Sequence, residues 1–150
     1  AARHLEHTLE IAPGFVPGRV RLAEALALAG RLGAAQAQAE NAFAAAPSLP
    51  RVRETRALVL AIAGRRSESR RELAALAAER RKRYVSAWEI ARAYAVMAEA
   101  DEAMHWLNEA IAERAPMTLF AGIHATLDPV RDDKRFAAIL HDIGLPITAG

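Results

Sequence analysis

Apolar residues along most of the chain recur at intervals of three and four, which is the spacing of one face of an α-helix. The segment 84–114 shows two such stripes, separated by room for only a short turn. Their residues are Ile90, Ala91, Tyr94, Ala103, Leu107 and Ala110. We therefore predict two helices here, and neither can bury its stripe without packing on the other and on a neighbouring pair.

The same pattern repeats without gaps at a period of 34 residues. Pro13 recurs as Pro47, and Gly30 recurs as Gly64 and then as Ala98. Gly suits the left-handed conformation that ends many helices, and small residues suit close helix crossings. The other aligned positions are Leu22, Arg56 and Ile90; Ala23, Ala57 and Ala91; Leu26, Leu60 and Tyr94; Ala35, Ser69 and Ala103; Ala39, Leu73 and Leu107; and Ala42, Leu76 and Ala110.

This period predicts helices at 1–12, 16–29, 33–46, 50–63, 66–80, 84–98 and 100–114. For the tail we predict a helix near 117–125, a turn at Asp128-Pro129 and a final helix near 133–142. Asp132 or Asp133 would cap the final helix, and Gly144 followed by Pro146 would end it. The apolar face of this helix should seal the last helix pair. It contains Phe136, Ile139, Leu140 and Ile143.

The period, the large–small–large apolar triplet, the Gly at the turn and the Pro after the second helix resemble the tetratricopeptide (TPR) repeat over roughly residues 1–115. The resemblance implies an all-α fold, a right-handed superhelical array of antiparallel helix pairs in one domain. That domain comprises a truncated repeat (1–12), three repeats (13–47, 48–81 and 82–115) and a C-terminal cap (116–150). Arg56 departs from the pattern, and Arg81 and Ala115 stand where the family has Pro.

A second resemblance lies in the tail. The run LDPVRDDKRFAAILHDIGLP is similar to the end of TPR regions in bacterial cyclases, serine/threonine kinases and winged-helix regulators, although that group usually has Pro where Lys134 stands. It implies a docking or sensory module of a larger bacterial signalling protein. The chain opens in the middle of a helix pattern and without Met, so we expect a further segment upstream. We expect a cytoplasmic location.

In TPR arrays, the first helix of each pair lines a concave groove that binds a peptide or a helix. Helical phase assigns Val20, Glu24 and Leu28 of the first pair to this groove. In the later pairs, the candidate ligand-binding residues are Arg51, Glu54, Leu58, Val85, Trp88 and Arg92. Trp88 is the candidate anchor of a bound peptide. The alternative is that Trp88 packs under the C-terminal tail.

Charge adds two further alternatives. Arg51 and Arg92 could hold an acidic peptide, or Glu54 and Glu89 could neutralise them. Residues 65–83 carry a local charge of +5 and residues 84–114 carry −4, within a net charge of +2. This pattern could steer an acidic partner or attract neighbouring repeats to one another. Nucleic-acid binding is disfavoured, because no aromatic residues lie among the arginines.

Composition limits the chemistry. About a quarter of the residues are alanine, which favours helices. The absence of Cys excludes disulfides and thiolate metal sites, and no apolar run is long enough to span a membrane. Turn formation and capping explain the acidic residues at 128, 132 and 133. We therefore expect no enzymatic activity, no cofactor or metal and no small-molecule substrate.

The partner that we expect is a protein or a peptide. The alternative function is an intramolecular regulatory or self-association segment of a cyclase, kinase or transcriptional regulator. A homodimer is a further possibility, because the Leu5 and Leu9 face of the first helix could be exposed if its repeat is truncated.

Overall fold

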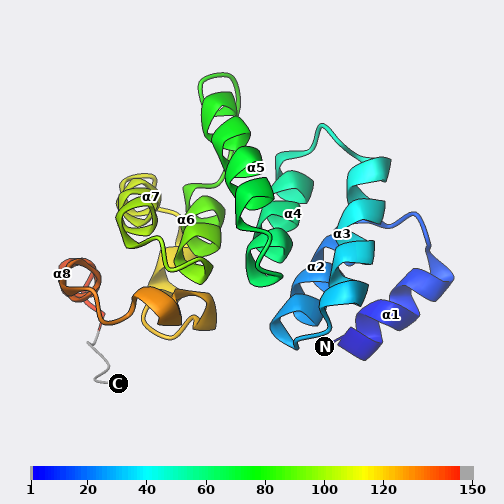
Figure 1. The fold of residues 1–150 in the computed structure, drawn as a ribbon, viewed down its shortest axis with the longest axis horizontal. Helices are drawn as coiled ribbons and strands as arrows, with labels where there is room; N and C mark the ends of the chain where they lie inside the picture. The colour runs from blue at the N-terminus through cyan, green and yellow to red at the C-terminus, as the bar shows by residue number, and fades with distance from the viewer. Residues whose placement is uncertain (1, 146–150) are drawn as a thin grey trace. The chain divides into compact units, whose positions relative to one another are not determined.

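The structure is a computed structural model that describes residues 2–145 of the 150-residue chain. These residues form helices joined by turns, with no β-strand among them, so the expected all-α class is confirmed. The α-helices are α1 (Ala2–Ile11), α2 (Val16–Leu28), α3 (Leu32–Ala45), α4 (Pro50–Ile62), α5 (Arg66–Glu79), α6 (Ala87–Val96), α7 (Ala100–Ala112) and α8 (Lys134–Asp142) (Figure 1). Two 3₁₀ helices, η1 (Pro116–Phe120) and η2 (Ala125–Val130), come between α7 and α8 in the chain.

The helix boundaries up to α7 lie within two residues of those that the repeat predicts, with one exception. We predicted that the sixth helix begins at residue 84, but α6 begins at Ala87. Ser86 caps it, because the Ser86 Oγ accepts a hydrogen bond from the backbone N–H of Glu89 at 3.3 Å. Ser followed three residues later by Glu is a capping-box sequence, which defines where the helix starts.

The turns after α2, α4 and α6 share one backbone conformation. Gly30 and Gly64 both have φ +77°, and Ala98, a further 34 residues along, has φ +57°. At each turn, the N–H of the next residue donates to a carbonyl five residues earlier, as from Arg31 to Leu26 at 2.9 Å. This is the Schellman arrangement that ends a helix. The predicted left-handed positions are therefore confirmed.

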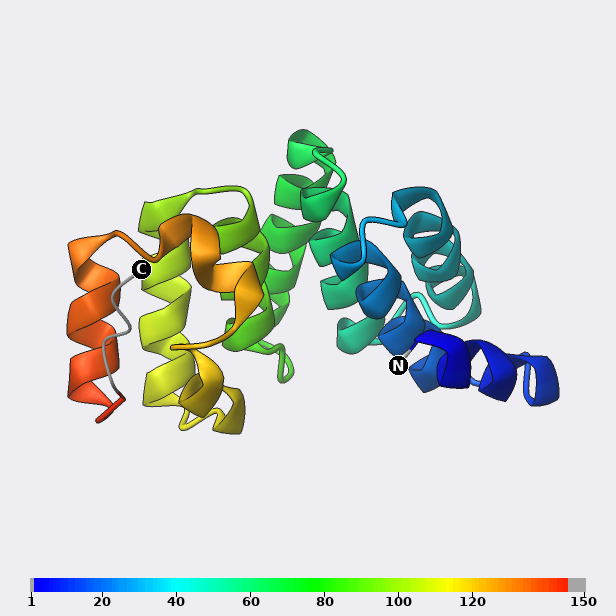
Figure 2. The same ribbon diagram turned by 90° about the horizontal axis from the view of Figure 1, so that it is seen from below.

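The described residues form two compact units, and the chain passes from the first to the second after Val85. In the first unit, α2 packs on α1, α3 and α4, and α4 also packs on α3 and α5 (Figures 1 and 2). Leu9 is buried in the core that α1, α2 and α3 share, and Leu5 packs against it. The expectation that this face of the first helix is exposed is therefore wrong, because α2 covers it.

Burial follows the 34-residue period in both units. At the positions where helices of a pair meet, the side chains are small and have no exposed surface. These residues are Ala23, Ala57, Ala91, Ala35, Ser69 and Ala103. The one hydroxyl in this set is satisfied, because Ser69 Oγ donates to the carbonyl oxygen of Ala57 at 2.8 Å. Small side chains thus allow the backbones of paired helices to approach closely.

Arg56, which stands where the repeat has a large apolar residue, is half-buried. Its guanidinium lies over the ring of Phe43, with 4.8 Å from Cζ to the ring centroid. Glu40 Oε1 and Glu72 Oε2 accept hydrogen bonds from it at 2.8 and 3.3 Å. The stem of an arginine can cover apolar surface while its head remains paired. Arg56 therefore takes the apolar position without leaving a buried charge.

In the second unit, α6 packs on α7 and on η2, while α7 packs on η1 and α8. The predicted helix near 117–125 is wrong, because this stretch is η1 followed by a turn. Asp128-Pro129, which we predicted as a turn, lies inside η2. Proline lacks the N–H that a longer α-helix would need, so only a short 3₁₀ segment forms.

The final helix is confirmed. Asp133 caps α8, because its Oδ1 accepts a hydrogen bond from the N–H of Arg135 at 2.8 Å. Gly144 has φ +74° and ends the helix, whereas Pro146 lies outside the described residues. The apolar face packs with α7 in one core, as expected for a sealing helix. Its buried residues are Phe136, Ile139 and Leu140.

Candidate functional site

The six predicted groove residues are divided between the two units. Arg51, Glu54 and Leu58 lie on α4, and Val85 is the last residue of the first unit. Trp88 and Arg92 lie on α6 in the second unit. Each group is described below within its own unit.

On α4, only Arg51 is exposed, whereas Glu54 and Leu58 are buried. Arg51 Nη2 donates to Glu24 Oε1 at 2.6 Å, and its Nη1 lies 3.9 Å from Glu54 Oε2. Thr55 Oγ1 donates to the same oxygen of Glu24 at 3.0 Å. The prediction that Glu54 neutralises Arg51 is thus confirmed in part, since Glu24 supplies the closer carboxylate.

Trp88 is a core residue and not a groove residue. Its side chain is 1% exposed, in a cluster with residues of α6, α7, η2 and α8. The indole makes an edge contact with the imidazole of His124, with 5.6 Å between ring centroids. A peptide anchor must be accessible, so the anchoring interpretation is wrong and packing against the tail is correct. Val85 is also buried.

Arg92 is buried with its charge compensated. Its Nη1 lies 2.5 Å from Glu89 Oε2, and its Nε donates to Thr126 Oγ1 at 3.3 Å. The alternative that Glu89 neutralises this arginine is therefore confirmed. Removing one partner of such a pair would leave the other charge buried and uncompensated.

An accessible hollow lies instead between the N-terminal ends of α2 and α4, with a volume of about 260 Å³. It is lined by Val16, Pro17, Val20, Arg21, Leu49, Arg51 and Val52. Val20 and Arg51 are two of the residues that helical phase assigned to the groove. Pro17 and Pro50 begin the two helices, because Pro fits the first turn, where its missing N–H costs nothing. The paired helix starts bring Val20 and Val52 into one buried cluster.

The hollow is apolar at its base and carries two guanidinium groups. Arg51 is held by Glu24, as described above. Arg21 is exposed, and within residues 2–145 the structure pairs it with no carboxylate. Leu49, at the end of the preceding turn, is half-exposed. The arrangement can therefore accept an apolar side chain next to a carboxylate.

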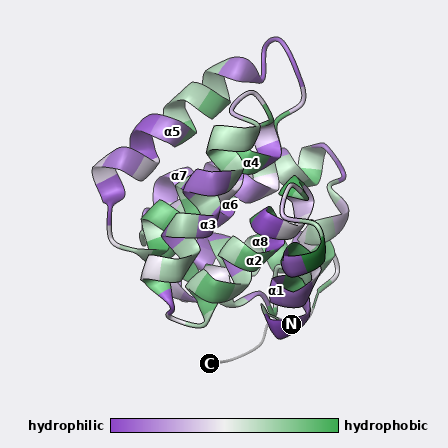
Figure 3. Cartoon of the chain, turned by 90° about the vertical axis from the view of Figure 1, so that its right-hand side faces the viewer, coloured by the Kyte–Doolittle hydropathy of each residue, from purple (hydrophilic) through white to green (hydrophobic). Residues whose placement is uncertain are grey.

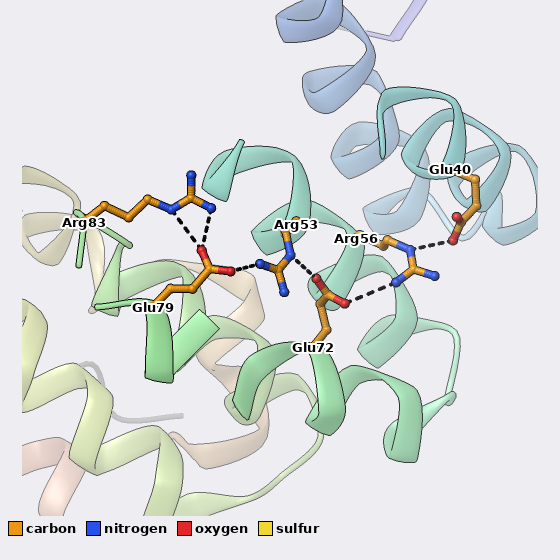
Figure 4. A network of polar contacts seen from close by, with 6 residues as sticks. All are labelled: Glu40, Arg53, Arg56, Glu72, Glu79 and Arg83. Atoms are coloured by element: carbon orange, nitrogen blue, oxygen red, sulfur yellow. Dashed lines mark hydrogen bonds and ion pairs between the residues drawn. The ribbon is translucent and has the colours of Figure 1, made fainter. Parts of the chain in front are cut away.

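The basic segment 65–83 is largely compensated within the first unit. Figure 3 shows hydrophilic residues along α5, and Figure 4 shows how some of them pair. Arg53 donates to Glu72 Oε1 at 2.6 Å and also to Glu79. Arg83 donates to Glu79 Oε2 at 2.6 Å, and this hydrogen bond, with that from Arg53, lowers the pKa of Glu79. Attraction between neighbouring helices, the second of our two interpretations, is what this part of the segment shows.

The acidic group of the tail is also accounted for by local structure. Asp128 Oδ1 accepts a hydrogen bond from Arg131 Nη2 at 2.6 Å. Asp133 is the cap of α8, and hydrogen bonds from Arg135 lower its pKa to about 2. Within residues 2–145, no cluster of three or more His, Asp or Glu side chains is placed to hold a metal ion. Nor does any helix there combine the length and the hydropathy that a bilayer crossing requires.

Comparisons with protein-family models, with curated proteins and with solved structures found no match for this chain.

Proposed function

We propose that the chain is a protein-interaction module of the TPR type, a right-handed superhelical array of antiparallel helix pairs within a larger bacterial signalling protein. Its partner is a peptide or helix that docks on the first helices of the pairs. The similarity of the tail sequence to TPR regions of signalling proteins motivates the context. The 34-residue period of burial and of left-handed turns supports the repeat.

The observation that carries the proposal is the hollow between the starts of α2 and α4. These are the first helices of two consecutive pairs, which is where a TPR groove would lie. The hollow is apolar and accessible, unlike the buried surroundings of Leu58 and Trp88. A side chain of Leu or Phe size would remove the surface of Leu49 and Val16 from water, at about 25 cal/mol per Å² buried.

Charge indicates the character of the docked segment. Arg21 and Arg51 lie at the same hollow as the apolar residues. A segment with an Asp or Glu next to its apolar anchor could bond to Arg21 without displacing Glu24 from Arg51. An exposed pair of this kind contributes up to about 1 kcal/mol, so it would guide orientation more than affinity.

The test begins with affinity capture by the full-length protein from the cells that make it. The captured partner is then purified and titrated against the parent, Leu49→Asp and Arg21→Glu. Leu28→Asp is the matched control, because Leu28 is 52% exposed and Leu49 is 49% exposed, while Leu28 lies at the opposite end of α2. We expect binding at least tenfold weaker for Leu49→Asp, weaker at low salt for Arg21→Glu, and unchanged for the control.

The proposal fails if no captured protein distinguishes the parent from Leu49→Asp. If the segment that depends on Leu49 belongs to the same polypeptide, the intramolecular regulatory function replaces an intermolecular one. Cross-linking of the full-length protein, followed by identification of the linked peptides, separates these two outcomes.

A further inference from the structure

The second unit exposes a group of large apolar side chains on η1 and the turn that follows it. Leu119 is 62% exposed and Ile123 is 75% exposed, while Met117 and Phe120 are each nearly half-exposed. Single exposed apolar residues are normal on a protein surface, but four within seven residues form a patch. We call these four residues, together with His124 and Ala125, the η1 patch.

The η1 patch is hollowed. Met117, Phe120, Ile123, His124 and Ala125 line an open depression of about 400 Å³. No residue in this lining carries a formal charge at neutral pH except His124 when it is protonated. The contact surface of any occupant must therefore be mainly apolar, because a buried unpaired charge is costly.

His124 is held in its neutral form. Burial lowers its pKa, and the nearby positive charge of Arg92 lowers it further, against the smaller opposing effects of Glu89 and Asp128. Its Nδ1 accepts a hydrogen bond from the backbone N–H of Thr126 at 3.4 Å. Since that N–H can only donate, the proton of the neutral imidazole is on Nε2. His124 thus adds one uncharged N–H donor to an otherwise apolar lining.

The backbone that carries the patch is tied to the rest of the unit. Arg131 Nη1 donates to the carbonyl oxygen of Gly122 at 2.6 Å, and Thr118 Oγ1 donates to that of Ala115 at 2.7 Å. The imidazole of His124 also rests against Trp88. A surface that is already ordered loses less conformational entropy when it binds.

The size of the patch selects among possible occupants. Taking roughly 200 Å² for a large side chain, the exposed fractions of the four residues amount to roughly 450 Å². A stable interface between two folded proteins buries about 800 Å² on each side, so the patch is too small for a firm self-dimer. It matches the contact of a single short helix that offers two or three apolar side chains in succession.

We propose that the η1 patch is a second docking surface, which binds the apolar face of a short amphipathic helix of a partner protein. Apolar residues at i, i+3 or i+4 and i+7 of that helix cover Leu119 and Ile123 and fill the depression. A carbonyl or hydroxyl oxygen of the helix can accept a hydrogen bond from His124 Nε2. This surface is separate from the hollow between α2 and α4, and it stands if that proposal fails.

The test uses a displayed library of random 16-residue peptides, selected on the parent protein in the presence of excess soluble Ile123→Asp. Enriched peptides are synthesised with a fluorophore and titrated by anisotropy against the parent and both variants. We expect apolar residues at helical spacing and binding at least tenfold weaker to Ile123→Asp. Leu49→Asp is the matched control and should bind within twofold of the parent. Circular dichroism establishes that each variant is folded.

Three results would overturn the proposal. One is that no peptide prefers the parent to Ile123→Asp. Another is that the enriched peptides lack apolar residues at helical spacing. The third is that sedimentation shows the parent to be a dimer that Ile123→Asp dissociates, in which case the occupant is a second copy of the chain.

Discussion

Ala98 has the same left-handed backbone conformation as Gly64, which precedes it by 34 residues, with φ values of +57° and +77°. Residues with a Cβ atom are strained in this region by about 1–2 kcal/mol, whereas glycine is not. The repeat therefore imposes the same turn on a residue that does not favour it. The unfavourable conformation persists because the packing of α6 on α7 requires a short turn there.

Replacing Ala98 with Gly should stabilise the protein. The relief of strain exceeds the entropy that an added glycine brings to the unfolded chain, so we expect the free energy of unfolding to rise by about 0.5–1 kcal/mol. Gly64→Ala is the reverse change in an equivalent turn. A Cβ there would contact nothing within 4 Å, so its destabilising effect, about 1 kcal/mol, would come from the backbone alone. Urea denaturation measures both, and shifts of the same sign would contradict this account.

Replacing Trp88 with Ala should damage the fold. The side chain is buried in the core of the second unit, so its removal leaves a large cavity and costs about 3–5 kcal/mol. Trp88→Phe should cost less, because its ring fills much of the space and the indole Nε1 has no hydrogen-bond partner in the described structure to lose. Urea denaturation followed by circular dichroism distinguishes the two. A Trp88→Ala protein as stable as the parent would return Trp88 to the role of a surface anchor.

Replacing Glu72 with Gln should destabilise the first unit, because Glu72 accepts hydrogen bonds from both Arg53 and Arg56 (Figure 4). Charged hydrogen bonds at half-buried sites are stronger than exposed ion pairs, and we expect a loss of about 1–2 kcal/mol. Glu68→Gln is the control, since it removes an exposed pair with Arg65 and should change stability little. Urea denaturation at low and high salt is the measurement. Equal effects of the two changes would mean that the network adds nothing.

The stability of the second unit should fall as the medium is acidified, because of His124. Burial and Arg92 lower the pKa of His124 in the folded protein below its ordinary value of 6.5. The folded state therefore binds this proton less readily than the unfolded state. Its stabilising contribution is complete above about pH 6.5 and is lost as the pH falls through the folded pKa. Thermal unfolding of the parent and of His124→Gln between pH 7.5 and pH 5 should show a smaller decrease for the variant, and parallel curves would refute this.

Much of the fold could be predicted because the repeat writes it into the chain at one fixed spacing. Alanines and a serine mark the close helix contacts, and glycines mark two of the three left-handed turns. The start of α6 was missed although Ser86 and Glu89 carry a recognisable capping sequence. Periodicity alone extends a helix to its last apolar residue, whereas a cap ends it at a hydrogen bond.

The candidate site was harder to predict, because helical phase gives the direction of a side chain but not what covers it. Trp88 does point away from its stripe, yet η2 packs on α6 and buries it. The short segment LDPV that forms η2 has no helical period from which this could be inferred. Arg51 was placed correctly at an accessible surface, but its closer partner, Glu24, lies 27 residues earlier in the sequence. The sequence did hold one signal of the hollow, the prolines that begin α2 and α4.

The packing order of the first unit also has a mechanical consequence. Its main contacts join helices that are one or two places apart in the chain, with α1 held chiefly by α2, and α5 chiefly by α4. No contact of the described helices clamps the first helix of this unit to its last. A pulling force on its two ends would therefore peel helices away one after another at low load, as in other linear repeats. A module of this kind stretches under tension and regains its shape by local steps when the tension is released.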